Sequence, residues 1–240
     1  MAIFALCDFI CLMMIKAEQK KEKTAVIPLA SALREVMSSR GFLRATVIQC
    51  LYYVALYSTI GFMGSYKQQE LSYTLTQIQL INIAGIAARI VLSRFFGYFS
   101  DRKGYLAGLT AGFVTLAAAF LVNIFSSPET RFMVVFFTLL QNVSIAGING
   151  NMQNIVYSVV PEQCFVHAQV IKNSIAGIAG FLASLISGKI LSVIQGGGNT
   201  FFGMRVYGQQ IFSAFSFAVT TATVAYMTCV IKNPSVRDGK

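Results

Sequence analysis

Residues 132–161 read FMVVFFTLLQNVSIAGINGNMQNIVYSVVP and contain no Asp, Glu, Lys or Arg over 30 positions. A helix needs only about 20 apolar residues to cross the hydrocarbon core of a bilayer. Lipid offers no hydrogen-bond partners, so a segment of this kind must satisfy its backbone groups internally, as a helix does. The stretch therefore predicts a transmembrane helix.

Other apolar segments lie on both sides of this one. Four more runs without charged residues cover 45–66, 71–88, 104–128 and 206–231. A further segment at about 170–194 is interrupted by Lys172 and Lys189, whose apolar stems let an ammonium group near a helix end reach the interface. The whole chain of 240 residues is 55% hydrophobic and only 12% charged, against about 25% charged residues in soluble domains. We expect an all-α polytopic membrane helix bundle.

Four parts make up the expected domain organisation. Residues 1–15 are apolar but too short to span alone, so they are interpreted as a partial transmembrane helix. Residues 16–41 are expected to form a cytoplasmic linker; its amphipathic pattern predicts a helix on the inner membrane surface, with a solvated linker as the alternative. A six-helix transmembrane bundle at 42–232 and a cytoplasmic tail at 233–240 complete the chain. The helices are expected at about 42–65, 72–99, 105–125, 131–160, 169–194 and 208–231.

The basic residues predict the orientation in the membrane. If the linker is cytoplasmic, 14 of the 19 Lys and Arg residues lie on the cytoplasmic side, as the positive-inside rule requires. The expected location is the cell membrane, multi-pass, with linker and C-terminus in the cytoplasm. This asymmetry explains the net charge of +10 better than nucleic-acid binding does, since no soluble domain is expected to carry a basic face.

Enzymatic and metal-site signatures are not found in the sequence. The five cysteines are scattered without a CxxC pair, and His167 has no ligand-type neighbours at metal-binding spacing. There is no Ser-His-Asp set, paired carboxylate site or HExxH motif. We therefore predict neither an enzyme nor a bound metal or cofactor.

One short motif carries more specific information. The turn between the second and third full spans reads GYFSDRKG, residues 97–104. Gly97 permits close backbone approach and Gly104 suits a tight turn, while Asp101 could bind the positive N-terminus of an opposing helix. Arg102 could pair with a carboxylate or a lipid phosphate. The four residues thus predict a conformational latch, and a solvated turn with positive-inside charge is the alternative.

The pattern Gly-x-x-x-Asp-Arg-x-Gly at a turn between two spans resembles the loop signature of major facilitator superfamily transporters. A weaker match follows in Val160-Pro161-Glu162, Ala168, Lys172-Asn173-Ser174 and the glycines at 177 and 180. Tyr105 and Leu106 stand where the family often has further basic residues. The resemblance implies a transporter of twelve helices in two six-helix halves, with the substrate path between the halves. This chain resembles the C-terminal half, whose partner would be a missing N-terminal half or a second copy.

Polar residues inside the spans mark a candidate substrate cavity. They lie on the first, second and fourth spans, three of the four that the resemblance places around the cavity: Gln49, Tyr53, Gln79, Asn82, Arg89, Asn142, Asn149 and Gln153. Hydrogen bonding between helices is the alternative role for the amides. No acidic residue lies deep in the six spans, so they offer no proton-binding carboxylate for coupling. Arg89 and the amides suggest an anionic or hydroxylated substrate.

The expected function is transmembrane transport of a small solute by alternating access, as the C-terminal half of a truncated or split transporter. The alternative is a non-transporting interaction or regulatory protein that docks on a full transporter. The expected partners are membrane lipid, the solute and the missing half or second copy, with no nucleic acid. Two stripes of small residues at four-residue spacing, Gly104 to Gly112 and Ala176 to Gly188, are expected to let helices pack closely.

Overall fold

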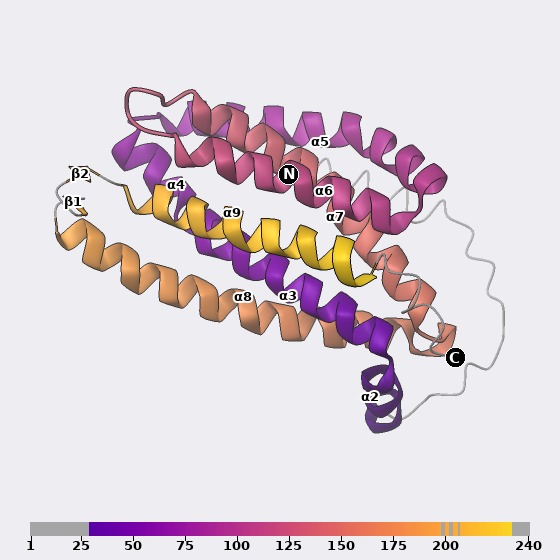
Figure 1. The fold of residues 1–240 in the computed structure, drawn as a ribbon. Helices are drawn as coiled ribbons and strands as arrows, with labels where there is room; N and C mark the ends of the chain where they lie inside the picture. The colour runs from indigo at the N-terminus through magenta and orange to yellow at the C-terminus, as the bar shows by residue number, and fades with distance from the viewer. Residues whose placement is uncertain (1–28, 198–199, 202–203, 206, 232–240) are drawn as a thin grey trace, which may run out of the picture.

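The computed structural model describes residues 29–197, 200–201, 204–205 and 207–231 (Figure 1). The described chain is a bundle of long helices joined by short turns. Its elements are α2 (Leu29–Ser38), α3 (Arg40–Ile60), α4 (Met63–Ser65), η1 (Tyr66–Glu70), α5 (Leu75–Lys103), α6 (Tyr105–Ile124), α7 (Met133–Val159), η2 (Glu162–Cys164), α8 (Phe165–Gly196), β1 (Thr200–Phe201), β2 (Met204–Arg205), α9 (Gly208–Tyr226) and η3 (Met227–Ile231). The partial helix predicted at 1–15 and the tail predicted at 233–240 lie outside the described residues.

Six of these helical segments are long and apolar enough to cross a membrane, which confirms the predicted fold class. The spans are Arg40–Glu70, Leu75–Lys103, Tyr105–Ile124, Met133–Val159, Glu162–Gly196 and Gly208–Cys229. Strands β1 and β2 add an antiparallel pair between α8 and α9 that the sequence did not predict, with Thr200 opposite Arg205.

Two predicted helix boundaries were wrong at the junction of the first and second spans. The first span continues through α4 and η1 to Glu70 instead of stopping near residue 65. It can do so because Lys67 is buried and donates a hydrogen bond from Nζ to Thr138 Oγ1 at 3.0 Å, so its charge does not end the helix. The second span begins at Leu75, where Thr74 and Gln77 form a reciprocal capping box.

Helix α2 lies within the predicted linker, where the amphipathic pattern predicted a helix. It contacts α3 and α8. Val36 is buried, whereas Leu33 and Met37 are exposed. The next helix is capped by Ser39, whose Oγ accepts a hydrogen bond from Phe42 N at 3.3 Å, so α3 begins at Arg40, two residues before the predicted boundary.

Four helices form a ring, and two lie outside it. Within the ring α6 packs against α7 and α9, and α3 packs against α7 and α9. Helix α5 adds to the α6–α7 side and α8 to the α3 side, as Figure 1 shows. We call the end where α3 and α6 begin the basic end, because Arg40, Arg44, Arg102 and Lys103 lie there.

Small residues set the closest helix crossings, as the stripes predicted. A Cβ added at Gly112 on α6 would lie 3.0 Å from the carbonyl carbon of Gly147 on α7. A Cβ added at Gly180 on α8 would lie 2.6 Å from the Tyr57 ring of α3. These backbones approach so closely because neither position carries a side chain.

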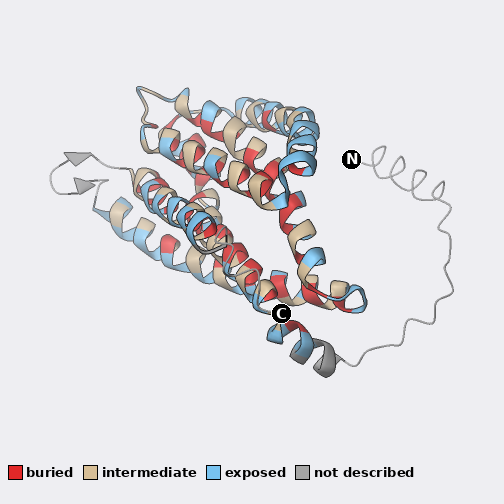
Figure 2. Ribbon diagram, turned by 45° about the vertical axis from the view of Figure 1, so that its right-hand side comes forward, coloured by how far each residue is buried: buried red, intermediate tan, exposed pale blue. Residues whose placement is uncertain are grey.

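Burial is uneven between the ring and the two outer helices (Figure 2). In the most apolar stretch of each span, 44% of residues are buried in the segment containing α3 and in α6, against 17% in α5 and 11% in the segment containing α8. Many exposed residues of α5 and α8 are large and apolar, such as Ile83, Ile90, Ile178 and Phe181. Lipid or another helical bundle must cover these faces.

Candidate functional site

The eight residues of the predicted cavity lie on three helices that meet in the structure. Helix α3 carries Gln49 and Tyr53, α5 carries Gln79, Asn82 and Arg89, and α7 carries Asn142, Asn149 and Gln153. Since α7 packs against both α3 and α5, the set occupies one region of the bundle. The residues differ, however, in depth along the helices and in their contacts.

Arg89 stands at the middle of α5, and its side chain is exposed in this bundle. Its guanidinium lies close enough to the Tyr52 side chain for the two groups to interact electrostatically. Tyr53 packs on both Tyr52 and Tyr57, with ring centroids 5.7 and 5.3 Å apart. The structure therefore brings together the central cation of α5 and an aromatic cluster of α3.

Helix α8 closes one side of this cluster. The Gly180 position lies against Tyr57 and against Cβ of Tyr53, where an added Cβ would be 3.3 Å from the latter. Eight residues earlier, about 12 Å toward the basic end, α8 carries Lys172. It lies on the same face as Ala168, Ala176 and Gly180, which are all buried.

Lys172 is only 2% exposed, and none of the described residues forms a hydrogen bond or ion pair with its ammonium. Sequence reasoning placed this lysine among the cytoplasmic charges instead of in the cavity. The signal was present, because extending the stripe Ala176, Gly180, Ser184 back by four residues reaches Lys172. A buried membrane lysine without a partner in the described part of the chain is a candidate ligand contact.

Asn142 takes part in helix packing. Its Nδ2 donates to Thr138 O on the same helix at 2.9 Å. It also fills the crossing of α5 and α7, since a Cβ added at Gly85 would lie 2.6 Å from Nδ2. This placement corresponds to the alternative role of the amides, contact between helices.

The remaining amides are spread along the bundle. Gln79 lies ten residues before Arg89, about 15 Å away along α5, toward the opposite end. Asn149 and Gln153 are exposed on α7. Both α5 and α7 end at the basic end, and Gly147 of α7 lies beside Phe96 of α5, which comes after Arg89. Asn149 and Gln153 therefore lie nearer the basic end than Arg89 does. Gln49 is buried, at 6% exposure, four residues before Tyr53 on the same helix.

Three of the predicted latch residues, Gly97, Asp101 and Arg102, lie in the last two turns of α5, and Gly104 forms its C-cap before α6. Gly104 adopts a φ of +90°, which favours glycine, and its N–H donates to Ser100 O at 2.8 Å. Asp101 and Arg102 are exposed, and the Arg102 guanidinium stacks 4.3 Å above the Tyr98 ring. A Cβ at Gly97 would have no neighbour within 4 Å among the described residues, so this face is open to another backbone.

The opposite end of the ring is closed by buried polar contacts. Gln209 donates to Thr59 O at 2.6 Å, and the Thr59 and Ser216 hydroxyls lie 2.8 Å apart. Nearby, Tyr66 donates to Ser126 O at 2.8 Å. These bonds tie α3, η1 and α9 to the end of α6, and sequence reasoning did not identify them.

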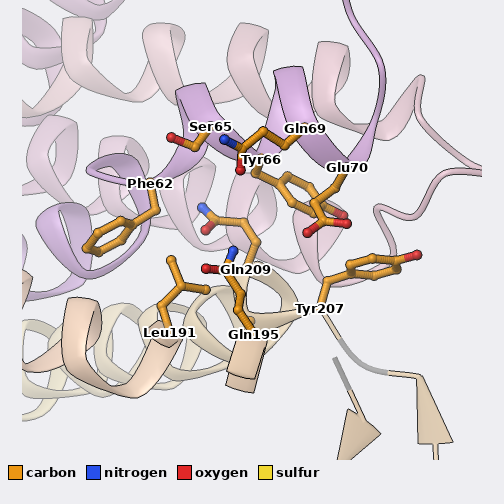
Figure 3. Close-up of a pocket in the computed structure, with 10 residues that line it drawn as sticks. Phe62, Ser65, Tyr66, Gln69, Glu70, Leu191, Gln195, Tyr207 and Gln209 are labelled. Atoms are coloured by element: carbon orange, nitrogen blue, oxygen red, sulfur yellow. The ribbon is translucent and has the colours of Figure 1, made fainter. Parts of the chain in front are cut away.

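A small pocket lies beside this closure, lined by side chains from η1, α8 and α9 (Figure 3). Tyr66, Gln195 and Gln209 converge on it, and Glu70 stands at its edge. Its volume of about 20 Å³ holds no more than a water molecule. None of the predicted cavity residues lines it, so it is not the solute site predicted from the sequence.

No group of metal-binding side chains occurs among the described residues. Their acidic residues within the spans stand near span ends, at Glu70, Asp101 and Glu162, whereas Arg89 and Lys172 lie deeper. The arrangement can accept a negatively charged group and offers no carboxylate at that depth.

Comparison with known proteins gives a family match over nearly the whole chain. Residues 1–188 and residues 45–235 each match the family described as Major Facilitator Superfamily. Searches among curated proteins and among solved structures gave no match.

Proposed function

The chain belongs to the major facilitator superfamily of membrane transporters, and we propose that its six helices form one of the two bundles of an alternating-access transporter for a small anion. Transport of this kind needs two bundles that move against each other around a central site. The second bundle would come from a further six-helix unit or a second copy of this one. The cell membrane is the proposed location, with the basic end in the cytoplasm.

The observation that carries the proposal is the pair of cations on the two least buried helices. Arg89 interacts with the tyrosine cluster of α3, and Lys172 is buried on the α8 face toward α3. Lys172 is buried within this bundle, whereas Arg89 is exposed on α5 and would be enclosed only by a second bundle. Holding two positive charges inside a membrane is costly unless an anion compensates them. A carboxylate or phosphate group on the solute would provide that compensation through charge-assisted hydrogen bonds.

The exposed faces of α5 and α8 support the two-bundle arrangement. Both helices flank the ring, and each carries a long row of exposed apolar residues. Arg89 lies on α5 and Lys172 on α8. A second bundle packed across them would enclose Arg89, Tyr53 and Lys172 between the halves. The remaining cavity residues, Gln49, Gln79, Asn82, Asn149 and Gln153, are proposed to line the path toward the two ends.

The end of α5 and its C-cap, residues 97–104, are proposed to act as the latch in this cycle. Gly97 leaves an open face, and Asp101 is exposed at the end of α5, where it can meet a helix N-terminus of the second bundle. Arg102 is held by Tyr98 and keeps the turn compact. Gly104 supplies the backbone conformation that brings α6 back at once.

Ligand-induced stabilisation of the purified chain tests the anion claim. The probes are a panel of mono- and dicarboxylates and inorganic phosphate, with neutral sugars for comparison. A bound probe at 100 times its Kd raises the unfolding free energy by about 2.7 kcal/mol. We expect at least one anion, and no neutral sugar, to raise the melting temperature.

Three variants locate the site. Arg89→Gln and Lys172→Gln should each weaken the effective anion by roughly tenfold to a hundredfold, since a hydrogen bond to a charged group contributes about 1.5–3 kcal/mol. Arg94→Gln, a matched loss of charge on α5 outside the site, should bind the anion like the wild type. Equal binding by all three variants, or stabilisation only by neutral sugars, would refute the proposal.

A further inference from the structure

A second, much larger cavity opens at the basic end of the bundle, and neither Arg89 nor Lys172 lines it. It is bounded by the start of α3, the start of α6, the end of α7 and η3, and has a volume of about 1100 Å³. Its walls are mostly apolar, with Ile48, Leu109 and Met152 among them. None of the predicted cavity residues lines it, so it has no part in the proposed solute path.

The groove is as deep as one leaflet. Along α6 its walls run from Tyr105 to Thr115, which is about 15 Å at 1.5 Å per residue. The hydrocarbon core of a bilayer is about 30 Å thick. The groove therefore starts at the membrane surface and ends near the bilayer midplane, as an acyl chain of one leaflet does.

The mouth of the groove is positively charged. Arg44 of α3 and Lys103 at the end of α5 both line it. The N-terminus of α6 lies there too, and its N-cap, Gly104, provides no side-chain cap. Asp101 and Glu162 lie at the same end of the bundle but do not line the groove.

We infer that this groove binds an anionic phospholipid of the cytoplasmic leaflet, with the phosphate between Arg44 and Lys103 and an acyl chain along α6. Apolar walls one leaflet deep beneath a cationic mouth match the two ends of such a lipid. Negative lipid at the cytoplasmic surface is attracted by about 1 kcal/mol for each nearby Lys or Arg.

Native mass spectrometry of the full chain, purified in detergent with equimolar phosphatidylglycerol and phosphatidylcholine, measures this preference. We expect the wild type to retain phosphatidylglycerol. The double variant Arg44→Gln/Lys103→Gln should lower the preference roughly thirtyfold, as the loss of two such attractions implies. The matched double variant Arg40→Gln/Arg94→Gln removes two charges near the same end that do not line the groove, and should keep the preference.

A second pair of variants tests the acyl-chain site without changing charge. Ala111→Phe fills the groove wall and should reduce retention of both lipids, whereas Ala218→Phe on the exposed face of α9 should not. The inference is overturned if both double variants lose the preference equally, because surface charge then suffices. It is also overturned if glycerol phosphate displaces the lipid while Ala111→Phe has no effect, since the site would then bind free phosphate. Loss of anion binding at Arg89 would leave these outcomes unchanged.

Discussion

The bundle buries a larger share of the segment containing α3 and of α6 than of α5 and α8. In the span containing α3 and in α6, 44% of the most apolar stretch is buried, against 17% in α5 and 11% in the span containing α8, although all four are similarly apolar. Hydropathy therefore marks all of them as membrane spans without telling which faces the bundle and which faces a partner. The cations Arg89 and Lys172 lie on the two poorly covered helices.

The glycines show the same contrast at single positions. Gly112 of α6 is pressed against the backbone of α7, at Gly147 and Ile148. Gly177 of α8 has no heavy atom within 4 Å of an added Cβ among the described residues. A side chain at the first position must displace a helix, while one at the second meets open space in this bundle.

The largest expected effect follows from this contrast. Gly112→Leu should destabilise the chain by about 3 kcal/mol, because the nearest atoms include backbone that cannot move aside. Thermal unfolding in detergent measures the loss. The matched change Gly177→Ala should leave stability equal or raise it by up to about 1 kcal/mol, since alanine favours a helix interior more than glycine does.

Equal losses of stability in both variants would contradict this contrast, because the α8 face would then be packed as tightly as the ring. A Gly177→Ala variant that is stable but transports less would support it. That outcome would place a second bundle on this face.

A smaller effect is expected at Lys67, the buried lysine of the closed end. Thr138→Val removes the hydroxyl that accepts its hydrogen bond and should cost about 2 kcal/mol, the desolvation penalty of a charged donor left without a partner. Adding Lys67→Met should recover most of this loss, since an apolar side chain of similar length needs no acceptor. Unfolding of the two single variants and the double variant forms a cycle that isolates the pair. Strict additivity would show that the bond contributes nothing.

Much of the fold could be predicted from charge spacing. Runs such as 132–161 fix the position of a span because lipid excludes charges, and the helix Met133–Val159 lies inside that run. The end of the first span could not be predicted in this way. Lys67 ends the charge-free run, but tertiary packing supplies an acceptor at Thr138 and the helix continues to Glu70.

The candidate site was less predictable. The position of a residue in the sequence indicates its depth and its helix face, but not which residues of other helices it contacts. Arg89 was found as a charge inside a span, but its proximity to Tyr52 depends on how α5 and α3 are placed by α7. Lys172 was assigned to the cytoplasmic side from its position at the start of the fifth expected span, although it lies on a buried stripe. Asn142 shows the converse, since an amide on the predicted polar face fills a helix crossing at Gly85.

Thiol reactivity in native membranes tests the central claim most directly, that the region around Arg89 is the wall of an aqueous path. In a cysteine-free background, Asn82→Cys and Asn149→Cys should react with a water-soluble methanethiosulfonate at least about tenfold faster than Leu121→Cys and Ala218→Cys, because only a hydrated thiol ionises readily. Leu121 and Ala218 are exposed on the opposite helices, α6 and α9. Equal rates at all four positions would contradict the account, since the predicted cavity would then face lipid.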